Sequence, residues 1–450
     1  MIPEFSAFSF AAPEELGVSS ESIMDFFNYV KAHSVEMHRF VLMRKDKVLS
    51  AAVFSPYKAD VPHILFSFSK SLTSTAAGFL WQDGLLSLNE KIIDIFPEFA
   101  PENPSENLKK CDIRSLLTMT CGHASEISWG EDSDASWIRK FMENEFVYAP
   151  GEAYMYNTAG TNVVAAIIQK KTGMKLTEYL KLKLTEPLGM ADIYCRALSD
   201  GTEAGGAGMY LALEDMMKFS SFLLHRGAYK GKQLLKSGWF DMAATFQTKT
   251  LSPVYDTDSK DWMKGYGFQF WMCQPEGVFR ADGAYGQFAI IDPKREMAAI
   301  INSASFNAQA VLQGLWDTIW KNAKDGPLPE NKKAGSALKA FMENAEIPPL
   351  FNPRMPDLEN FIKGKTFLPK ENLPSFPDII GGSGRHQGND SPLQALSFEF
   401  TEEGLNLIVT SKKGTSSLPV SYAAPGPILN MQAFPMPQAA PIPALIPSGS

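Results

Sequence analysis

The hydrophobic pattern changes at Ser67 from a short apolar run to helical spacing. Residues 64–66 are all apolar, and beyond Ser67 the apolar positions recur every three or four residues, at Leu72, Ala76, Phe79 and Leu80. This spacing predicts a helix that buries one face and begins close to Ser67. Lys70 lies three residues further along, so its side chain and that of Ser67 share one face of the helix.

Helical and strand patterns alternate through the rest of the first 325 residues. Residues 19–33 have helical spacing, residues 39–53 alternate as a β-hairpin would, and residues from about 85 to 225 are mostly helical. Strand character returns after Tyr266. Strands from both ends of this region, separated by a helical insertion, predict a sandwich of sheet and helices beside a helical domain, with a site at their seam.

Beyond residue 325 the pattern and the composition both change. Residues 326–351 are rich in Pro, Lys and Glu and predict a linker. Residues 396–400 and 405–410 predict a hairpin, so we expect a small β-rich module over residues 352–422. Residues 423–450 are so rich in Pro and Ala that neither regular helix nor sheet is expected in this tail. Residues 1–325 then form the main domain.

Composition limits the class of protein. Of the 450 residues, 45% are hydrophobic and 20% are charged, which is typical of globular domains. The net charge of −8 includes no basic run, so nucleic acid is not an expected partner, and no stretch reaches the ~18 apolar residues of a membrane span. The four cysteines are scattered, and the N-terminus lacks the basic and apolar regions of a signal peptide. We expect a cytoplasmic protein, unless a leader has been removed from the sequence.

Ser67 and Lys70 form the strongest chemical pattern in the chain. Ser-x-x-Lys occurs three times, but the match at Ser55 contains a proline and the match at Ser336 lies in a charged stretch. A serine hydroxyl becomes a nucleophile when a base removes its proton, and a lysine can do so if burial lowers its pKa well below ~10. The alternative is that Ser67 only caps the helix.

A tyrosine and an amide lie in residues 150–160, PGEAYMYNTAG, directly before another apolar helix. Together with residues 67–70, this stretch resembles the serine β-lactamase and penicillin-binding-protein superfamily, in the branch that holds class C β-lactamases and family VIII carboxylesterases. The resemblance extends over roughly residues 13–321. It implies an α+β fold of the β-lactamase/transpeptidase type: an antiparallel sheet flanked by helices, with an all-helical insertion at about 85–225. It also implies an acyl-enzyme on Ser67, formed without a metal or other cofactor.

The second motif of this superfamily is altered here. The superfamily has Tyr-x-Asn, whereas this chain has Tyr156-Asn157-Thr158. The resemblance implies that Tyr156 is the proton shuttle of the reaction, and that either neutral Lys70 or Tyr156 as phenolate takes the Ser67 proton. A buried structural tyrosine is the alternative. Asn157 is the nearest equivalent of the asparagine, but it comes one position early, and this shift can turn its side chain away from Ser67.

The third motif, Lys-Thr-Gly on a strand, has a literal match only at residues 171–173. This match ends a predicted helix, where Gly173 suits the C′ position, so we do not assign it to the site. We place the equivalent strand at residues 281–284 instead. There Gly283 would let a substrate lie against the backbone, and the Ala284 N–H would join the Ser67 N–H in an oxyanion hole.

The strand equivalent lacks the usual cation. Ala281 occupies that position, and Asp282 follows it. In β-lactamases the cation commonly helps to hold the substrate carboxylate, so the resemblance implies that anionic β-lactams are disfavoured as substrates here. Asp282 either favours an amine-bearing substrate or is a turn or strand-end carboxylate bonded to the backbone.

Other residues near these motifs could shape a pocket. His63 and His123 lie near the motifs in sequence, and Trp129, Trp137 and Trp271 could form an acyl-binding wall. Large aromatic residues are more often simply part of a core.

We therefore expect a serine hydrolase that forms an acyl-enzyme with small esters, as the likeness to family VIII carboxylesterases implies. A β-lactamase, or a D-amino-acid peptidase or amidase, is the alternative within the same fold. A catalytically inactive homologue that binds a ligand or assembles is the alternative of another class, because two of the three motifs depart from the pattern.

Overall fold

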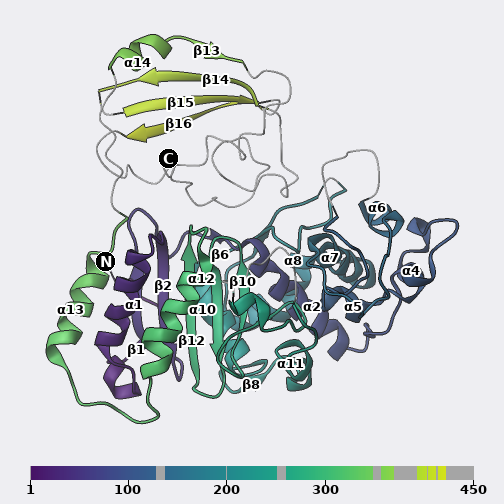
Figure 1. The fold of residues 1–450 in the computed structure, drawn as a ribbon, viewed down its shortest axis with the longest axis horizontal. Coiled ribbons are helices and arrows are strands. Elements are labelled where there is room, and N and C mark those ends of the chain that lie inside the picture. Colours follow the sequence, from purple (N-terminus) through teal and green to yellow (C-terminus); the bar gives the residue numbers. More distant parts are fainter. Residues whose placement is uncertain are drawn as a thin grey trace.

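A seven-stranded sheet forms the centre of the larger part of the molecule (Figure 1). The computed structural model describes residues 2–127, 137–198, 200–250, 260–347, 356–368, 393–402, 404–411 and 414–421. The strand order is β1-β3-β2-β12-β11-β10-β9, and every neighbouring pair is antiparallel except β1 with β3. The strands are β1 (Ser9–Phe10), β2 (Met37–Arg44), β3 (Lys47–Val53), β9 (Trp271–Met272), β10 (Phe279–Gly283), β11 (Gln287–Asp292) and β12 (Met297–Ser303). Strands from both ends of the predicted domain meet in this sheet, which confirms the α+β fold.

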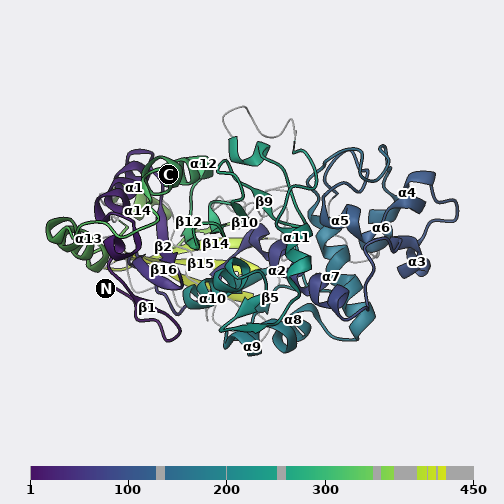
Figure 2. The same cartoon turned by 90° about the horizontal axis from the view of Figure 1, so that it is seen from below.

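Helices cover both faces of the sheet. Alternate residues of β2 point to opposite faces, so Phe40 and Val41 belong to different hydrophobic cores. The Phe40 core contains α1 (Ser20–Ala32) and α12 (Ala308–Gly314), and the Val41 core contains α2 (Ser69–Gln82) and α10 (Leu213–Leu224). Figure 2 shows α1 and α12 on the opposite side of the strands from α10. Every residue of β2 is consequently buried, as in sheets that are covered on both sides.

A group of helices lies at one end of the sheet and packs through α7 on α2 (Figure 1). These helices are α3 (Ile92–Ile95), α4 (Glu106–Lys110), α5 (Ile113–Leu117), α6 (Trp137–Glu143), α7 (Thr158–Thr172), α8 (Leu176–Leu180) and α9 (Glu186–Leu188). The insertion expected at about 85–225 is not entirely helical. Its short strands β5 (Tyr194–Cys195) and β6 (Met209–Leu211) form a small sheet with β4 (His63–Ile64), and its last helix, α10, covers the central sheet.

Part of the segment predicted as a linker is a packed helix. Helix α13 (Lys332–Glu343) contacts α1 and β3, and its Leu338 and Met342 side chains are buried. A second, four-stranded antiparallel sheet follows, formed by β13 (Thr366–Phe367), β14 (Leu393–Phe400), β15 (Gly404–Ser411) and β16 (Gly414–Ser421), with helix α14 (Pro356–Ile362) before it. The expected hairpin is present as β14 and β15, whereas the predicted tail, 423–450, lies outside the described residues. The division of the chain at residues 325, 351 and 422 stays a prediction.

The remaining described elements are short. They are the hairpin β7 (Ala228–Tyr229) and β8 (Lys232–Gln233), helix α11 (Ser237–Ala243), the 3₁₀ turns Pro13–Leu16, Phe66–Phe68, Pro97–Phe99 and Lys260–Met263, and the π-helical turns Lys181–Thr185 and Leu315–Trp320. None of the helices within the described ranges is long and apolar enough to cross a membrane.

A chain of hydrogen bonds ties β4, which leads into Ser67, to the start of β2. Glu36 Oε1 lies 3.0 Å from His38 Nε2, and His38 Nδ1 lies 2.9 Å from His63 Nε2. The other ring nitrogen of His63, Nδ1, lies 2.9 Å from the Ile64 carbonyl oxygen. The backbone just before Ser67 is therefore connected to the central sheet through two buried imidazoles.

The donors and acceptors in this series of hydrogen bonds limit where its protons can lie. The Ile64 carbonyl can only accept, so a neutral His63 carries its proton on Nδ1 and accepts from His38 Nδ1. A neutral His38 then has no proton left on Nε2, and Glu36 must donate one to it. Burial lowers the pKa of His38 to about 3 and raises the pKa of Glu36, and both shifts favour the Glu36 carboxyl group over His38 Nε2 as the holder of the shared proton.

This proton assignment makes a testable distinction between two substitutions of Glu36. Glu36→Gln keeps a donor for His38 Nε2, so the free energy of unfolding at pH 7 should stay close to that of the wild type. Glu36→Ala removes the donor and should lower it by about 1 kcal/mol. Urea unfolding of both variants measures the difference. An equal loss of unfolding free energy in the two variants would show that the negative charge of Glu36, rather than its proton, stabilises the hydrogen bonds to His38.

Candidate active site

Ser67 lies in a single 3₁₀ turn, Phe66–Phe68, that leads directly into α2. The predicted helix is therefore present, but its α-helical part begins at Ser69. Phe66 has a φ of 47°, in the left-handed region that a bulky residue rarely adopts and that costs on the order of 1–3 kcal/mol. Ser67 does not cap this helix, since the N-cap residues of the 3₁₀ turn and of α2 are Leu65 and Phe68. The backbone is thus strained at the residue that precedes the predicted nucleophile.

Lys70 is buried beside Ser67 and has three polar neighbours. Its Nζ lies 3.1 Å from Ser67 Oγ, 3.2 Å from Thr158 Oγ1 and 2.7 Å from the Gly206 carbonyl oxygen. The Gly206 carbonyl can only accept, so it takes one N–H of the amine. When Thr158 accepts a second N–H, the lone pair of a neutral amine faces Ser67 Oγ. In that arrangement the basic electron pair of Lys70 is directed at the predicted nucleophile.

The burial of Lys70 also makes its neutral form accessible near neutral pH. Only 1% of the residue is exposed, and this desolvation lowers the pKa of Lys70 to about 7. The negative charges of Glu126 and Asp282 act in the opposite direction and keep the pKa from falling further. Lys70 therefore has the property that a general base requires, a pKa close to the working pH.

The Tyr156 ring lies directly beside Lys70. The amine is 4.8 Å from the ring centroid, and the Tyr156 ring stacks on Trp271 with 5.8 Å between the ring centroids. Tyr154 and Tyr266 contact the same indole. The structure therefore brings Ser67, Lys70 and Tyr156 into one place, while the role of Tyr156 as a proton shuttle stays a prediction.

Asn157 does not take the place of the asparagine that the superfamily motif supplies. Its Oδ1 accepts from the Gly160 N–H at 3.1 Å, which makes it the N-cap of α7, and its Nδ2 lies 3.3 Å from His123 Nδ1. The residue that reaches Lys70 is Thr158. Thr158 stands two positions after Tyr156, the same spacing as in Tyr-x-Asn, and sequence reasoning missed it by looking for an amide.

The literal Lys-Thr-Gly triplet lies outside the site. Lys171 and Thr172 are in the last turn of α7, where Lys171 pairs with Glu90, and Gly173 follows at a φ of 72° as the C-cap. The left-handed conformation at the end of a helix favours glycine, as the sequence pattern indicated.

The end of β10 packs against the segment that leads to Ser67. A Cβ atom on Gly283 would lie 2.1 Å from the Leu65 carbonyl oxygen, so only glycine fits at this position. Ala284 follows on the exposed side, and Ala281 is buried in the core. The predicted partners of the oxyanion hole, Ser67 and Ala284, thus belong to two backbone segments that touch at Leu65 and Gly283.

Asp282 has a charged partner that the sequence pattern did not indicate. Its Oδ2 accepts from Arg280 Nε at 2.8 Å, and both side chains are buried. Burial raises the pKa of Asp282 to about 6, although Arg280 opposes this shift. The carboxylate is therefore compensated inside the protein, rather than bonded to the backbone as the alternative reading expected.

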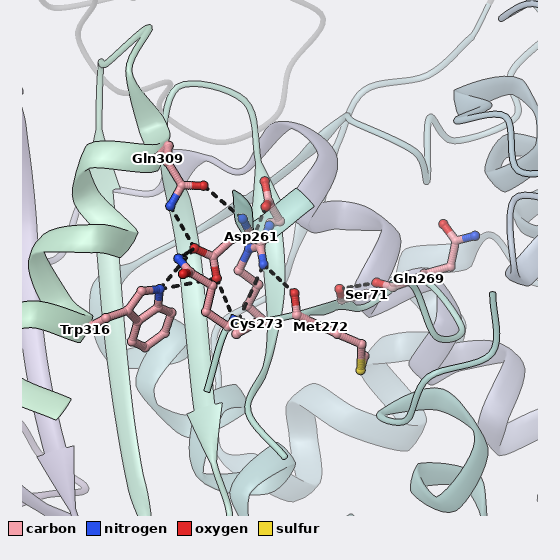
Figure 3. A network of polar contacts seen from close by, with 10 residues as sticks. Ser71, Asp261, Gln269, Met272, Cys273, Gln309 and Trp316 are labelled. Carbon is pink, nitrogen blue, oxygen red and sulfur yellow. Dashed lines mark hydrogen bonds and ion pairs between the residues drawn. The ribbon is translucent and has the colours of Figure 1, made fainter. Parts of the chain in front are cut away.

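Arg280 joins Asp282 to the aromatic wall of the site. Its guanidinium lies 4.7 Å from the ring centroid of Trp262 and 5.7 Å from that of Trp271. The neighbouring residue of Trp262, Asp261, is fully buried. Its carboxylate accepts from Gln309 Nε2 of α12 at 2.8 Å and from Trp316 Nε1, in the turn after α12, at 3.0 Å (Figure 3). These bonds hold the segment that carries Trp262 against α12. Sequence reasoning had no signal for this network, since its members come from distant segments.

The two histidines near the motifs have structural contacts. His63 belongs to the chain that holds β4, and His123 packs against Phe141 and Phe146, where burial lowers the pKa of His123 to about 4. Trp137 is also buried in the core, and Trp129 lies outside the described residues. Within the described part of the chain, His, Cys, Asp and Glu side chains form no group that could hold a metal ion.

Comparison with known proteins agrees with this geometry. The family described as Beta-lactamase matches residues 29–323, and the chain belongs to this family of hydrolases.

The 6-aminohexanoate-dimer hydrolase of Paenarthrobacter ureafaciens is 25% identical over 281 residues, which cover 58% of this chain and 71% of that protein. The lovastatin esterase of Penicillium rubens is 26% identical over 171 residues, or 33% of this chain and 43% of the esterase. The crystal structure of a family VIII carboxylesterase superposes with a TM-score of 0.52 and 16% identity, covering 70% of this chain and 100% of that one. The expected superfamily and fold are confirmed.

The lowered pKa of Lys70 has a consequence for stability. Between pH 7 and 10.5 the unfolded chain holds a proton on Lys70 that the folded protein has released, so this residue opposes folding, and the opposition weakens as the pH rises. Lys70→Met removes this cost and should raise the melting temperature by roughly 2–6 °C at pH 7. The gain should shrink as the pH approaches 10.

Thermal unfolding of the wild type and Lys70→Met at several pH values measures this effect. Lys339→Met, at an exposed lysine of α13, is the control that should show no such pH dependence. A difference between Lys70→Met and the wild type that stays constant from pH 7 to 10 would contradict the lowered pKa.

Proposed function

We propose that this protein is a carboxylesterase that hydrolyses small esters through an acyl-enzyme on Ser67. The observation that carries the proposal is the contact of Ser67 Oγ with the buried Lys70 amine at 3.1 Å, in surroundings that lower the pKa of the amine to about 7. A hydroxyl and a neutral amine in this arrangement are a nucleophile and its base.

The reaction follows from this pair. Lys70 takes the proton of Ser67 while Ser67 Oγ attacks the ester carbonyl carbon, and the carbonyl π electrons move to the oxygen. The N–H groups of Ser67 and Ala284 hold the oxyanion, and the loss of one such donor typically costs ~10²-fold in rate. Tyr156 relays the proton to the departing alcohol as the C–O bond breaks. Water then attacks the acyl-enzyme by the same route and releases the acid.

Two features support an ester over a β-lactam. The position of the motif lysine holds the buried Ala281, and the neighbouring cation, Arg280, already pairs with Asp282, so neither residue offers a free charge to the carboxylate of a β-lactam. The similarity to lovastatin esterase points in the same direction. Hydrolysis of a small amide is the second candidate, because the 6-aminohexanoate-dimer hydrolase covers more of this chain.

A fluorophosphonate probe tests whether Ser67 is the nucleophile. The probe should label the wild type and fail to label Ser67→Ala. Ser336→Ala is the matched control, because Ser336 is an exposed serine in another Ser-x-x-Lys pattern, and it should be labelled like the wild type. Equal labelling of Ser67→Ala would remove the proposed nucleophile, and an unlabelled wild type would favour an inactive homologue.

Substrate comparison then separates the candidate activities. We expect kcat/KM for p-nitrophenyl butyrate to exceed that for nitrocefin and for the linear 6-aminohexanoate dimer. Faster hydrolysis of the dimer would establish the amidase alternative, and faster hydrolysis of nitrocefin the β-lactamase alternative.

The Thr158 hydroxyl should contribute to the rate by holding the Lys70 amine. Thr158→Val keeps the shape of the side chain but removes the acceptor, and should lower kcat/KM for p-nitrophenyl butyrate about tenfold. Thr158→Ser keeps the acceptor and should retain most of the activity. Wild-type kinetics for the valine variant would mean that Lys70 does not depend on this contact.

A further inference from the structure

Three aromatic side chains form a continuous surface beside Ser67. The Phe66 and Tyr285 ring centroids are 5.3 Å apart, and the Tyr285 and Phe306 centroids are also 5.3 Å apart. Both pairs meet edge to face, at interplanar angles of 67° and 90°. We name these three residues the aromatic ladder. Its first member precedes the predicted nucleophile directly in the chain.

The ladder is built by three segments that converge on the site. Phe66 belongs to the 3₁₀ turn of Ser67, and Tyr285 follows Ala284 in the turn between β10 and β11. Phe306 lies just beyond β12, whose last residue, Ser303, donates from its Oγ to the Tyr285 carbonyl oxygen at 2.7 Å. The ladder thus flanks both backbone segments assigned to the oxyanion hole.

Two members of the ladder have an unfavourable backbone conformation. Phe66 has a φ of 47° and Tyr285 a φ of 63°, and each such residue costs on the order of 1–3 kcal/mol. Strain of this kind persists where the surroundings enforce it, and it concentrates at functional sites. Here it accompanies two aromatic side chains that contact each other next to Ser67.

The outermost ring of the ladder, Phe306, is not part of a hydrophobic core. Phe306 is 90% exposed, and Phe66 and Tyr285 are only partly buried, so the ladder presents apolar surface to solvent. Single exposed apolar residues are common, but a connected aromatic surface beside a nucleophile has the character of a ligand site. Two of the polar contacts of Lys70 come from the insertion, through Thr158 at the start of α7 and Gly206 before β6, whereas the ladder comes from segments next to the central sheet. Ser67 thus contacts the buried Lys70 amine and directly follows the first ring of the ladder in the chain.

We propose that the aromatic ladder binds the acyl group of the substrate and that this group is an uncharged aliphatic chain of medium length. This proposal rests on the proposed esterase function and adds its specificity. An ester whose carbonyl carbon meets Ser67 Oγ can lay its hydrocarbon tail on the exposed rings, which removes apolar surface of both partners from water. An acetyl group is too short to gain from all three rings, so the chain-length preference should depend on Phe306.

The test compares p-nitrophenyl acetate with p-nitrophenyl octanoate for the wild type, Phe306→Ala and Phe306→Leu. We expect Phe306→Ala to reduce the ratio of kcat/KM for octanoate to that for acetate about tenfold, and Phe306→Leu to restore most of it. Phe361→Ala is the matched control, because Phe361 is 63% exposed on α14, outside the site, and this substitution should leave the ratio at the wild-type value.

The outcomes separate this proposal from the proposed function. A wild type that hydrolyses both esters while Phe306→Ala leaves their ratio unchanged overturns the ladder and leaves the esterase intact. A Phe306→Ala effect that follows the size of the alcohol in a series of butyrate esters, and not the acyl chain, overturns the assignment of the acyl group. A wild type that hydrolyses no ester and is not labelled by the fluorophosphonate overturns the proposed function, and the ladder loses its substrate with it.

Discussion

The burial of the Lys70 amine is the constraint on which the site depends. A charged amine is costly to bury away from water. Here burial favours the neutral amine by lowering the pKa of Lys70, and Thr158 and Gly206 supply acceptors for its N–H groups. The three polar neighbours come from the turn before α2, from the start of α7 and from the segment before β6. Lys70 is therefore in place only when the sheet domain and the helical part have packed together.

Much of the site could be predicted from local pattern. The apolar spacing behind Ser67 indicated the helix that carries Lys70, and the preference of helix ends for glycine showed that the triplet at residues 171–173 is not the strand motif. The two halves of the sheet were also visible as strands before and after the helical insertion. These features depend on neighbours within a few residues, so a single sequence contains them.

The missed residues depend on contacts between distant segments. Thr158 reaches Lys70 across the interface of α2 and α7, and Arg280 meets Trp262 only when β10 packs against the Lys260–Met263 turn, although its ion-pair partner Asp282 lies on the same strand. The superfamily motif also specifies an amide at this position, so a search for that motif passes over the Thr158 hydroxyl, which can accept a hydrogen bond from Lys70 as well. Sequence reasoning placed Asn157 correctly near the site but could not foresee that it would cap α7, since both uses suit the residue.

The packing of α13 has a practical consequence for recombinant work. This helix lies within the stretch that composition marks as a connector, yet Phe341 packs on Phe27 at 4.4 Å and Met342 Sδ meets Ser50 Oγ at 3.2 Å. A fragment that ends near residue 325 would expose to solvent the surface of α1 and β3 that α13 covers. An expression clone of the hydrolase unit without the second sheet should run on to residue 347, so that the helix stays with the surface it shields.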